Sequence, residues 1–352
     1  AGKTVVFTGS PGAYRPWLDG VEVREIGTER FPGLVLARGV RRRARRLRWL
    51  ASGVARDLTS HGVDVLFSPV QEGPLAGRTP AVVVMHDLTA LRFPGAYDLG
   101  TVAQTRWLLP RMLRRAARVV AVSRNTRADL LEFFGLAPGK VEVVGEGCDR
   151  TVFYPRPAEQ IGEVTRRYGL AGRYFLYAGT FSLHKNVGLV VEALSRLGSM
   201  ASDVHLALVG RSDVGGGTKL EQLIRHHRLE TRVHRLGYVP REDLATLMSG
   251  ASAFVYPSRY EGFGLAPLEA MACGAPVLAS EVASLPEVVG GAGMLISEAA
   301  VGPWADGLSA ALQVDRALAR TAAVAQASKF DWNTAGELLG ELLLNVANGH
   351  AY

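Results

Sequence analysis

Cysteines and long apolar runs are both scarce in this sequence, and each shortage excludes a class of protein. Cys148 and Cys273 are the two cysteines among 352 residues, and they stand far apart in the chain. One distant pair gives neither a disulfide framework nor the spacing of a metal site, so a reducing setting is expected. No apolar run reaches the roughly 18 residues that cross a bilayer, and the first residues carry no secretory signal pattern. We therefore expect a cytoplasmic protein without a membrane-spanning helix.

The length and composition of the chain favour two globular α/β domains. A chain of 352 residues exceeds one typical hydrophobic core, and 48% hydrophobic with 21% charged residues is ordinary for globular proteins. Short apolar runs alternate with amphipathic stretches, which is typical of buried parallel strands joined by helices. The predicted strands are Thr4–Thr8, Val63–Phe67, Ala81–Met85, Arg118–Val122, Val141–Val144, Tyr174–Tyr177, His205–Val209, Ala253–Tyr256, Pro276–Ala279 and Gly293–Ile296. The predicted helices include Arg127–Phe134, Leu189–Leu197, Lys219–His227 and Arg241–Ser249.

A change of composition between Asp149 and Gly172 marks the best domain boundary. Two prolines, a polar helical stretch and two glycines precede a new series of strands and helices that begins at Tyr174. We predict two doubly wound, Rossmann-like halves that face a central cleft, because domain interfaces of this kind often hold ligands. The predicted divisions are residues 1–155, residues 170–328 and a final helix within residues 329–352.

The chain is basic, with a net charge of +7 and a sequence pI of about 9.6, which favours anionic partners. Seven arginines lie between Arg38 and Arg48, and apolar residues recur among them at steps of three and four, as in an amphipathic helix. A solvated basic face is the simplest interpretation. The second is a patch that touches an anionic membrane or acceptor. Nucleic acid is not expected, because no aromatic residues alternate with the basic ones.

The stretch from Tyr260 to Val277, YEGFGLAPLEAMACGAPV, carries the clearest chemistry. Glu261 and Glu269 stand eight positions apart, on a glycine loop and about one turn inside the helix that follows it. The N–H groups at a helix start attract anionic oxygen, and a carboxylate accepts hydroxyl donors in fixed geometry. Gly274 and Pro276 stop the helix. The pattern suits a site that holds phosphate on one side and hydroxyls on the other. Its plain alternative is two solvated carboxylates at a helix start.

Several motifs together resemble the retaining glycosyltransferases of family 4. The two glutamates with EGFG and AMACGAPV are similar to the E-x7-E motif of that family. Tyr177–Asn186, YAGTFSLHKN, is similar to the first strand and loop of its donor domain, and Leu236–Ser258 to its nucleobase segment. Val82–Pro94 and Val119–Gly135 look like its acceptor side. The resemblance runs from about Val63 to the C-terminus.

The resemblance implies a GT-B fold and a retaining transfer of a hexose from GDP-mannose or a UDP-sugar. The acceptor would be a hydroxyl of a glycan, a lipid or a small-molecule glycoside, and no metal or other cofactor is implied. The first sixty residues depart from the family pattern. The loop Thr8–Tyr14, TGSPGAY, which contains Gly12, replaces the usual glycine-rich loop, or the natural N-terminus is missing from the sequence.

The family pattern assigns roles to particular residues. By resemblance, Glu261 lies near the hydroxyls of the donor sugar, Glu269 binds the ribose, and Lys185 contacts the pyrophosphate. A cation there would stabilise charge that builds on the leaving phosphate. His86 would lie beside the donor sugar and the acceptor. It need not be a general base, since the leaving phosphate itself can take the proton of the acceptor.

Further residues complete the predicted site. Thr180 stands where many members have an arginine, so His184 or Arg259 is expected to supply the missing positive charge. Backbone N–H groups around Phe263 would cradle the sugar and the distal phosphate. The full donor-binding set is Thr180, His184, Arg211, Val239, Arg259, Gly262, Phe263, Gly264, Leu265 and Glu269. The predicted acceptor-binding set is Gly12, Asp87 and Ser123, and the catalytic set is His86, Lys185 and Glu261.

Two other functions are consistent with the same residues. One is a GT-B sugar phosphorylase or a sugar-nucleotide epimerase, which would act without a carbohydrate acceptor. The other is a non-catalytic, nucleotide-sugar-binding subunit that regulates a partner. The presence of Glu261, Glu269, Lys185 and His86 together argues against the second.

Overall fold

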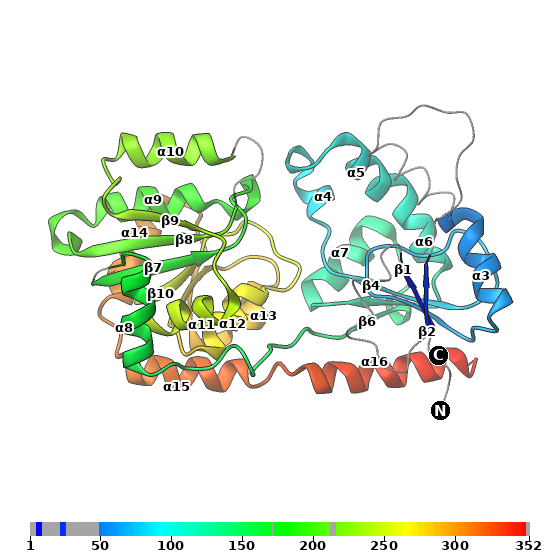
Figure 1. The fold of residues 1–352 in the computed structure, drawn as a ribbon. Coiled ribbons are helices and arrows are strands. Elements are labelled where there is room, and N and C mark those ends of the chain that lie inside the picture. The colour runs from blue at the N-terminus through cyan, green and yellow to red at the C-terminus, as the bar shows by residue number, and fades with distance from the viewer. Residues whose placement is uncertain (1–4, 9–21, 26–48, 171, 212–215, 350–352) are drawn as a thin grey trace.

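The structure is a computed structural model that describes residues 5–8, 22–25, 49–170, 172–211 and 216–349. The arginine cluster Arg38–Arg48 and the predicted acceptor residue Gly12 lie outside these ranges. In Figure 1 two α/β units stand side by side, and a long helical segment near the C-terminus runs along one side of both.

Four parallel strands form the main sheet of the N-terminal half, in the order β3-β4-β5-β6. All five residues of β4 are buried, as expected for a β-branched, apolar run at the centre of a parallel sheet. The strands are β3 (Leu66–Ser68), β4 (Ala81–Met85), β5 (Arg118–Ala121) and β6 (Val141–Val143), beside a separate parallel ribbon of β1 (Val5–Thr8) and β2 (Glu22–Glu25). The helices are α3 (Val54–Ser60), α4 (Thr89–Arg92), α5 (Leu99–Ala103), α6 (Leu109–Arg115) and α7 (Arg124–Phe134), with π-helical segments at Trp49–Gly53 and Gln104–Leu108.

Six parallel strands form the sheet of the C-terminal half, in the order β12-β11-β10-β7-β8-β9. The chain builds outward from β7 to β9 and then returns to β10 on the other side of β7. The carboxyl ends of β7 and β10 therefore mark the topological switch point, where doubly wound sheets bind ligands. The strands are β7 (Arg173–Ala178), β8 (Val204–Val209), β9 (Val233–Gly237), β10 (Ala253–Tyr256), β11 (Val277–Ser280) and β12 (Met294–Ile296). The helices are α8 (Ala158–Arg167), α9 (Val187–Arg196), α10 (Gly216–His226), α11 (Arg241–Gly250), α12 (Leu265–Ala272), α13 (Leu285–Val289) and α14 (Val301–Ala311).

Each predicted strand coincides with an observed strand, with ends that differ by up to three residues. Two observed strands, β2 and β9, were not predicted. β9 has the sequence VHRLG, in which only Val233 is buried and Arg235 and Gly237 are exposed, as suits the edge of the sheet. An edge strand with polar residues lacks the apolar run by which central strands are found. The four predicted helices are also confirmed, although α7 and α10 each begin three residues earlier than expected.

The C-terminal helices link the two halves. α15 (Arg316–Ala327) packs against α12, and α16 (Trp332–Ala347) continues along the N-terminal half, as Figure 1 shows. A Cβ atom added to Gly147 would lie 2.4 Å from the backbone nitrogen of Trp332, so the connection between the halves passes directly against the start of α16. No helix within the described ranges is long and apolar enough to cross a membrane.

Candidate functional site

The predicted donor residues gather at the carboxyl edge of the larger sheet. Lys185 follows β7 and Glu261 follows β10, the two strands that flank the switch point. Gly179 and Gly210 follow β7 and β8 with φ angles of +152° and +132°. A Cβ atom on Gly210 would lie 1.9 Å from the carbonyl oxygen of Gly179, so these two loops approach as closely as glycine permits.

The Tyr260–Val277 stretch forms the loop, helix and stop that its sequence predicts. Gly264 precedes α12 with a φ of +114°, and Gly274 follows the helix with a φ of +76°. The Oγ of Ser284 donates hydrogen bonds to the carbonyl oxygens of Glu261 (3.0 Å) and Phe263 (2.7 Å). The ring of Phe263 packs edge-on against Phe330, which lies between α15 and α16. The loop is therefore held by its own half and by the C-terminal connection.

Lys185 and Glu261 form a close ion pair at the switch point. The Lys185 Nζ lies 2.6 Å from the Glu261 Oε1 and donates to the Tyr256 hydroxyl at 3.1 Å. Both side chains of the ion pair are largely buried, with 16% and 12% of their surface exposed. An ammonium group has three donors, so one remains for a phosphate oxygen. Burial and the Glu261 carboxylate hold the pKa of Tyr256 well above its usual value, so its phenol stays protonated beside the pair.

Glu269 is largely buried on α12, and burial raises the pKa of its carboxyl group to about 7. Arg241 opposes this shift and Asp149 adds to it, but their effects are smaller than that of desolvation. Among the described residues, no hydrogen bond to the Glu269 carboxyl group is observed. A buried carboxyl group that lacks donors is suited to accept hydroxyl groups of a ligand, which would favour its ionised form.

We expect the affinity for a nucleotide sugar to fall as the pH drops below 7. The pKa of Glu269 is about 7 in the free protein, and ligand hydroxyls that donate to the carboxylate lower it in the complex. Below pH 7 binding must therefore displace a proton, and Kd should rise about tenfold per pH unit between about pH 7 and 5.5. Calorimetric titration with an intact nucleotide sugar, whose diphosphate does not titrate in this range, measures the effect. Glu269→Gln should bind more weakly and without this slope. A wild-type Kd that is constant across the range would contradict the assignment.

His86 ends β4 and is held at both ring nitrogens. Its Nδ1 lies 2.9 Å from Glu146 Oε1, and its Nε2 lies 2.8 Å from the carbonyl oxygen of Pro69. Both partners are acceptors, so the geometry favours an imidazolium that donates twice. The hydrogen bond to Glu146 is the main cause of a raised His86 pKa. In this arrangement the ring has no free lone pair that could take a proton from the hydroxyl group of an acceptor substrate.

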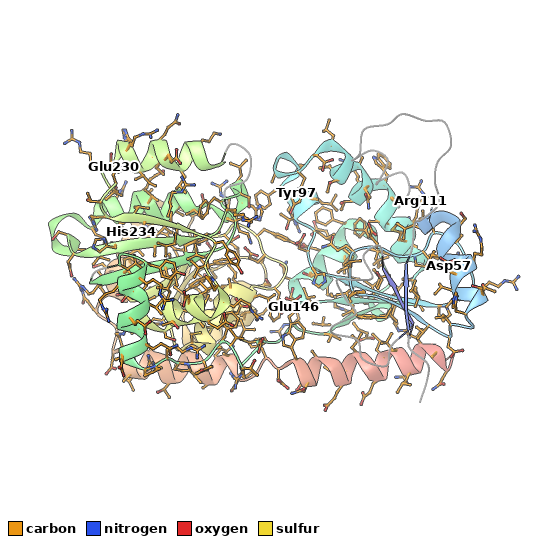
Figure 2. The ribbon with its side chains drawn as sticks, in the orientation of Figure 1. Asp57, Tyr97, Arg111, Glu146, Glu230 and His234 are labelled. Carbon is orange, nitrogen blue, oxygen red and sulfur yellow. The ribbon has the colours of Figure 1, made fainter. Side chains whose placement is uncertain are left out.

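Glu146 was not predicted as a site residue. It lies three residues after β6, at the same sheet edge as His86, and Figure 2 shows it in the region between the two halves. His86 was predicted because it is a polar residue directly after a predicted parallel strand. The same criterion, applied to the residues after Val141–Val144, would have identified Glu146.

The predicted acceptor residues form contacts within the protein. Asp87 Oδ1 accepts from the backbone N–H of Thr89, and Ser123 caps α7 by accepting from the N–H of Thr126. The Ser123 hydroxyl also donates to the carbonyl oxygen of Gly262 at 2.6 Å. Ser123 therefore lies where the two halves touch. Its role in acceptor binding, like that of Asp87, stays a prediction.

The remaining donor residues follow neighbouring strands of the larger sheet, and within the described residues no hydrogen bond is observed between the ion pair and the side chain of Thr180, Arg211 or Arg259. The backbone N–H of Arg259 donates to the carbonyl oxygen of His184 at 2.7 Å, and the Arg259 side chain is exposed. Thr180 and Arg211 are also exposed, and the Thr180 hydroxyl lies 2.9 Å from that of Ser182. Of the other predicted donor residues, Val239 is buried and Leu265 is 38% exposed. Which group replaces the missing arginine stays a prediction.

Two family profiles match the chain and together extend over both halves. The profile of the group 1 glycosyl transferases matches residues 169–327, and that of glycosyltransferase family 4 matches residues 4–152. The second match begins well before Val63, where the sequence motifs begin. The similarity to the family therefore includes the arginine-rich N-terminal segment, in which no family motif was identified.

Several proteins are similar in sequence. O-antigen chain mannosyltransferase B of Escherichia coli is 34% identical over 72% of this chain and 67% of its own length. MMP alpha-(1->4)-mannosyltransferase of Mycolicibacterium hassiacum is 33% identical over 51% of this chain and 41% of its own length. Alpha-maltose-1-phosphate synthase of Mycolicibacterium smegmatis is 33% identical over 62% of this chain and 58% of its own length. The chain thus spans about half the length of the last two.

Solved structures confirm the predicted GT-B fold. HepE of Anabaena, in complex with UDP and glucose, superposes with a TM-score of 0.76 at 22% identity, over 97% of this chain and 99% of that chain. WaaG, a glycosyltransferase involved in lipopolysaccharide biosynthesis, superposes with a TM-score of 0.72 at 19% identity, over 97% and 91% of the two chains. At these identities the likeness shows the fold alone.

Proposed function

The chain belongs to glycosyltransferase family 4, and from this premise we propose that it is a retaining hexosyltransferase that uses a nucleotide sugar. The C-terminal half, residues 170–328, binds the donor, and the N-terminal half, residues 1–155, binds the acceptor. Residues 329–352 carry the helix that crosses back to the acceptor half. The acceptor is a hydroxyl group of a glycan, a lipid or a glycoside.

The observation that carries this proposal is the Lys185–Glu261 pair at the switch point. Glu261 lies on the loop that leads into α12, the helix that carries Glu269, and Lys185 reaches it from the loop after β7. The remaining Lys185 donor and the free N–H groups of α12 are placed for a diphosphate, and Glu269 for a ribose. Glu261 then positions the sugar hydroxyls between the two halves.

The charge that develops in the reaction falls on the leaving phosphate. Lys185 and the N–H groups after Gly262 stabilise that charge more strongly in the transition state than in the bound donor. Both ring nitrogens of His86 already face acceptors, Glu146 Oε1 and the carbonyl oxygen of Pro69, so His86 does not take the proton of the acceptor hydroxyl. The proton of the acceptor hydroxyl passes to a phosphate oxygen of the departing nucleotide. Closure of the halves excludes water and limits hydrolysis of the donor.

GDP-mannose is the first donor that we propose, and a UDP-sugar is the second. Mannosyl transfer appears in the names of the first two relatives described above, and UDP with glucose was found in HepE. A thermal-shift panel with GDP, UDP and ADP and their common sugars separates these donors, because a ligand that binds the native state alone raises apparent stability by about 2.7 kcal/mol at a hundredfold excess over Kd. Turnover with the stabilising donor follows, with and without an acceptor sugar.

The outcomes of the turnover assay separate the three functions. Nucleotide release that requires an acceptor hydroxyl supports the transferase. Phosphorolysis of a glycoside, or epimerisation without an acceptor, supports the first alternative. Binding without turnover, together with activity that follows a co-purifying protein, supports a regulatory subunit.

We also propose peripheral contact with an anionic membrane through Arg38–Arg48, a segment outside the described residues. The described part of the same half adds an exposed surface on the helical stretch 99–115. Leu99 is 88% and Trp107 is 65% exposed, and Arg106 and Arg111, also exposed, lie next to Trp107 along the helical stretch. Apolar and aromatic side chains flanked by arginines are typical of surfaces that bind at the lipid interface.

Liposome flotation tests this contact. We expect more protein on phosphatidylglycerol vesicles than on neutral phosphatidylcholine vesicles, with high salt lowering the difference. Replacing both Leu99 and Trp107 with serine should reduce recovery on the anionic vesicles. Equal recovery on neutral and anionic vesicles would overturn the proposal.

A further inference from the structure

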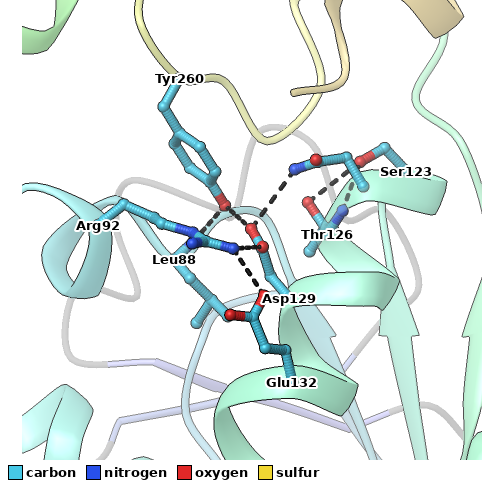
Figure 3. Close-up of polar contacts among 8 residues, drawn as sticks. Leu88, Arg92, Ser123, Thr126, Asp129, Glu132 and Tyr260 are labelled. Carbon is cyan, nitrogen blue, oxygen red and sulfur yellow. Dashed lines mark hydrogen bonds and ion pairs between the residues drawn. The ribbon is translucent and has the colours of Figure 1, made fainter. Parts of the chain in front are cut away.

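Tyr260, the residue before the first motif glutamate, reaches from the donor half into the acceptor half. Its hydroxyl donates to Asp129 Oδ2 at 2.6 Å and accepts from the backbone N–H of Leu88 at 3.2 Å. Tyr260 and Asp129 are 5% and 3% exposed. Figure 3 shows the tyrosine entering from the motif loop to meet the aspartate on α7. A buried hydrogen bond therefore joins the two halves at this point.

Asp129 is also held by an arginine of its own half. Asp129 Oδ1 accepts from Arg92 Nη2 at 2.5 Å, and the same nitrogen donates to Glu132 Oε2 at 2.9 Å. One carboxylate oxygen thus faces the arginine and the other faces the tyrosine. Because Asp129 is paired with Arg92 within its own half, removing the tyrosine hydroxyl does not leave an unpaired buried charge.

Two further contacts join the same segments. The carbonyl oxygen of Gly262 accepts from the hydroxyl groups of Ser123 and Thr126, at 2.6 and 3.0 Å. Glu287 of α13 also accepts from the backbone N–H groups of Arg124 and Asn125 at the start of α7. The N-terminus of α7 is therefore bonded to the donor half at two places, the motif loop and α13.

Glu261 lies between the two residues that the acceptor half holds. Tyr260 is bound by its side chain and Gly262 by its carbonyl oxygen, whereas the Glu261 side chain turns back to Lys185 in the donor half. The seating of the halves therefore adds to the contacts of Ser284 and Lys185, which hold Glu261 from within the donor half. If the halves separate, the loop loses both contacts that fix its two neighbouring residues.

We propose that Tyr260 and Asp129 are positioning residues that couple closure of the two halves to the placement of Glu261 against the donor sugar. This proposal rests on the proposed transferase function. Their hydrogen bond forms when the acceptor half seats on the motif loop, and it holds the loop in the arrangement that completes the site. Nucleotide binding within the donor half does not require it.

The experiment compares Tyr260→Phe with the wild type, since phenylalanine keeps the ring that packs beside Phe93. Loss of the hydroxyl should lower kcat for transfer about tenfold or more, with Kd for the nucleotide sugar unchanged within about twofold. Asp129→Asn should lower kcat similarly, and the double variant should be no worse than the more impaired single variant. Tyr168→Phe is the matched control, because the bond from Tyr168 at the end of α8 to Asp243 of α11 (2.8 Å) does not join the donor half to the acceptor half.

A second readout does not depend on activity. Hydrogen exchange in the presence of nucleotide should increase at residues 86–88 and 260–264 in Tyr260→Phe, and not in Tyr168→Phe. Unchanged kcat and unchanged exchange in Tyr260→Phe would overturn the proposal, and so would a parallel loss of nucleotide affinity. If the wild type lacks transfer activity, the proposed function fails, whereas the exchange result still decides whether the bond couples the halves.

Discussion

Replacing Lys185 with methionine should lower kcat about 100- to 1000-fold, the size of loss seen when one preorganised donor to a developing charge is removed. Methionine keeps the length and much of the volume of the side chain, so the packing beside Tyr256 is largely preserved. The ammonium group that faces the leaving phosphate is lost, and Glu261 is left without its 2.6 Å partner. Since the effect lies mainly in the transition state, kcat should fall more than the affinity for the nucleotide.

Single-turnover kinetics and nucleotide titration of Lys185→Met measure the two quantities separately. Lys329→Met is a matched control, because Lys329 is exposed and bonds the side chain of Gln326 within its own segment. The control should retain wild-type kcat. If Lys185→Met keeps a near wild-type kcat but binds the nucleotide weakly, the prediction is wrong, and the lysine contributes to ground-state binding alone.

Replacing Gly262 with alanine should lower kcat more than 100-fold by keeping the halves from seating. A Cβ atom at this position would lie 1.6 Å from the carbonyl oxygen of His86 and 2.8 Å from the Cβ of Asp87. The clash is with backbone of the other half, which no rotamer change relieves. A misplacement of about 1 Å in a catalytic arrangement can cost about 100-fold in rate. Nucleotide binding to the donor half should be weakened far less.

Gly139→Ala is the control for this substitution, because its added Cβ would meet no atom within 4 Å. It should leave both kcat and the nucleotide-induced thermal shift unchanged. If Gly262→Ala transfers sugar at the wild-type rate, the contact between the motif loop and the His86 backbone is not needed for catalysis. If the variant unfolds, its thermal transition will show this before any kinetic comparison is made.

The fold was largely predictable because its buried parallel strands carry a strong signal. Runs such as Ala81–Met85 and Ala253–Tyr256 are apolar on both faces, and glycine and proline mark their ends. The edge strand β9 was not predicted, because a strand at the edge of a sheet needs no continuous apolar run. The loop and helix of the E-x7-E motif were predictable as well, since Gly264 and Gly274 take the left-handed φ angles for which glycine is suited.

The partners of the site residues were less predictable, because they come from segments far apart in sequence. Asp129 meets Tyr260 across 131 positions, and Glu146 meets His86 across 60. Asp129 lies within an amphipathic helix, where a carboxylate is ordinarily solvated, and nothing local reveals that it is buried. The raised pKa of Glu269 likewise follows from tertiary burial, which the spacing of the motif does not contain.

The stereochemistry of the product tests most directly whether this site carries out retaining transfer from a nucleotide sugar. The wild type and Glu261→Gln are incubated with GDP-mannose, or with the donor that the thermal-shift panel selects, and with an acceptor sugar, and the anomeric proton of the new glycoside is followed by NMR. We predict an α-linked product from the α-linked donor, formed by the wild type and strongly reduced in Glu261→Gln. A β-linked product, or transfer at an equal rate by Glu261→Gln, would contradict the proposed mechanism.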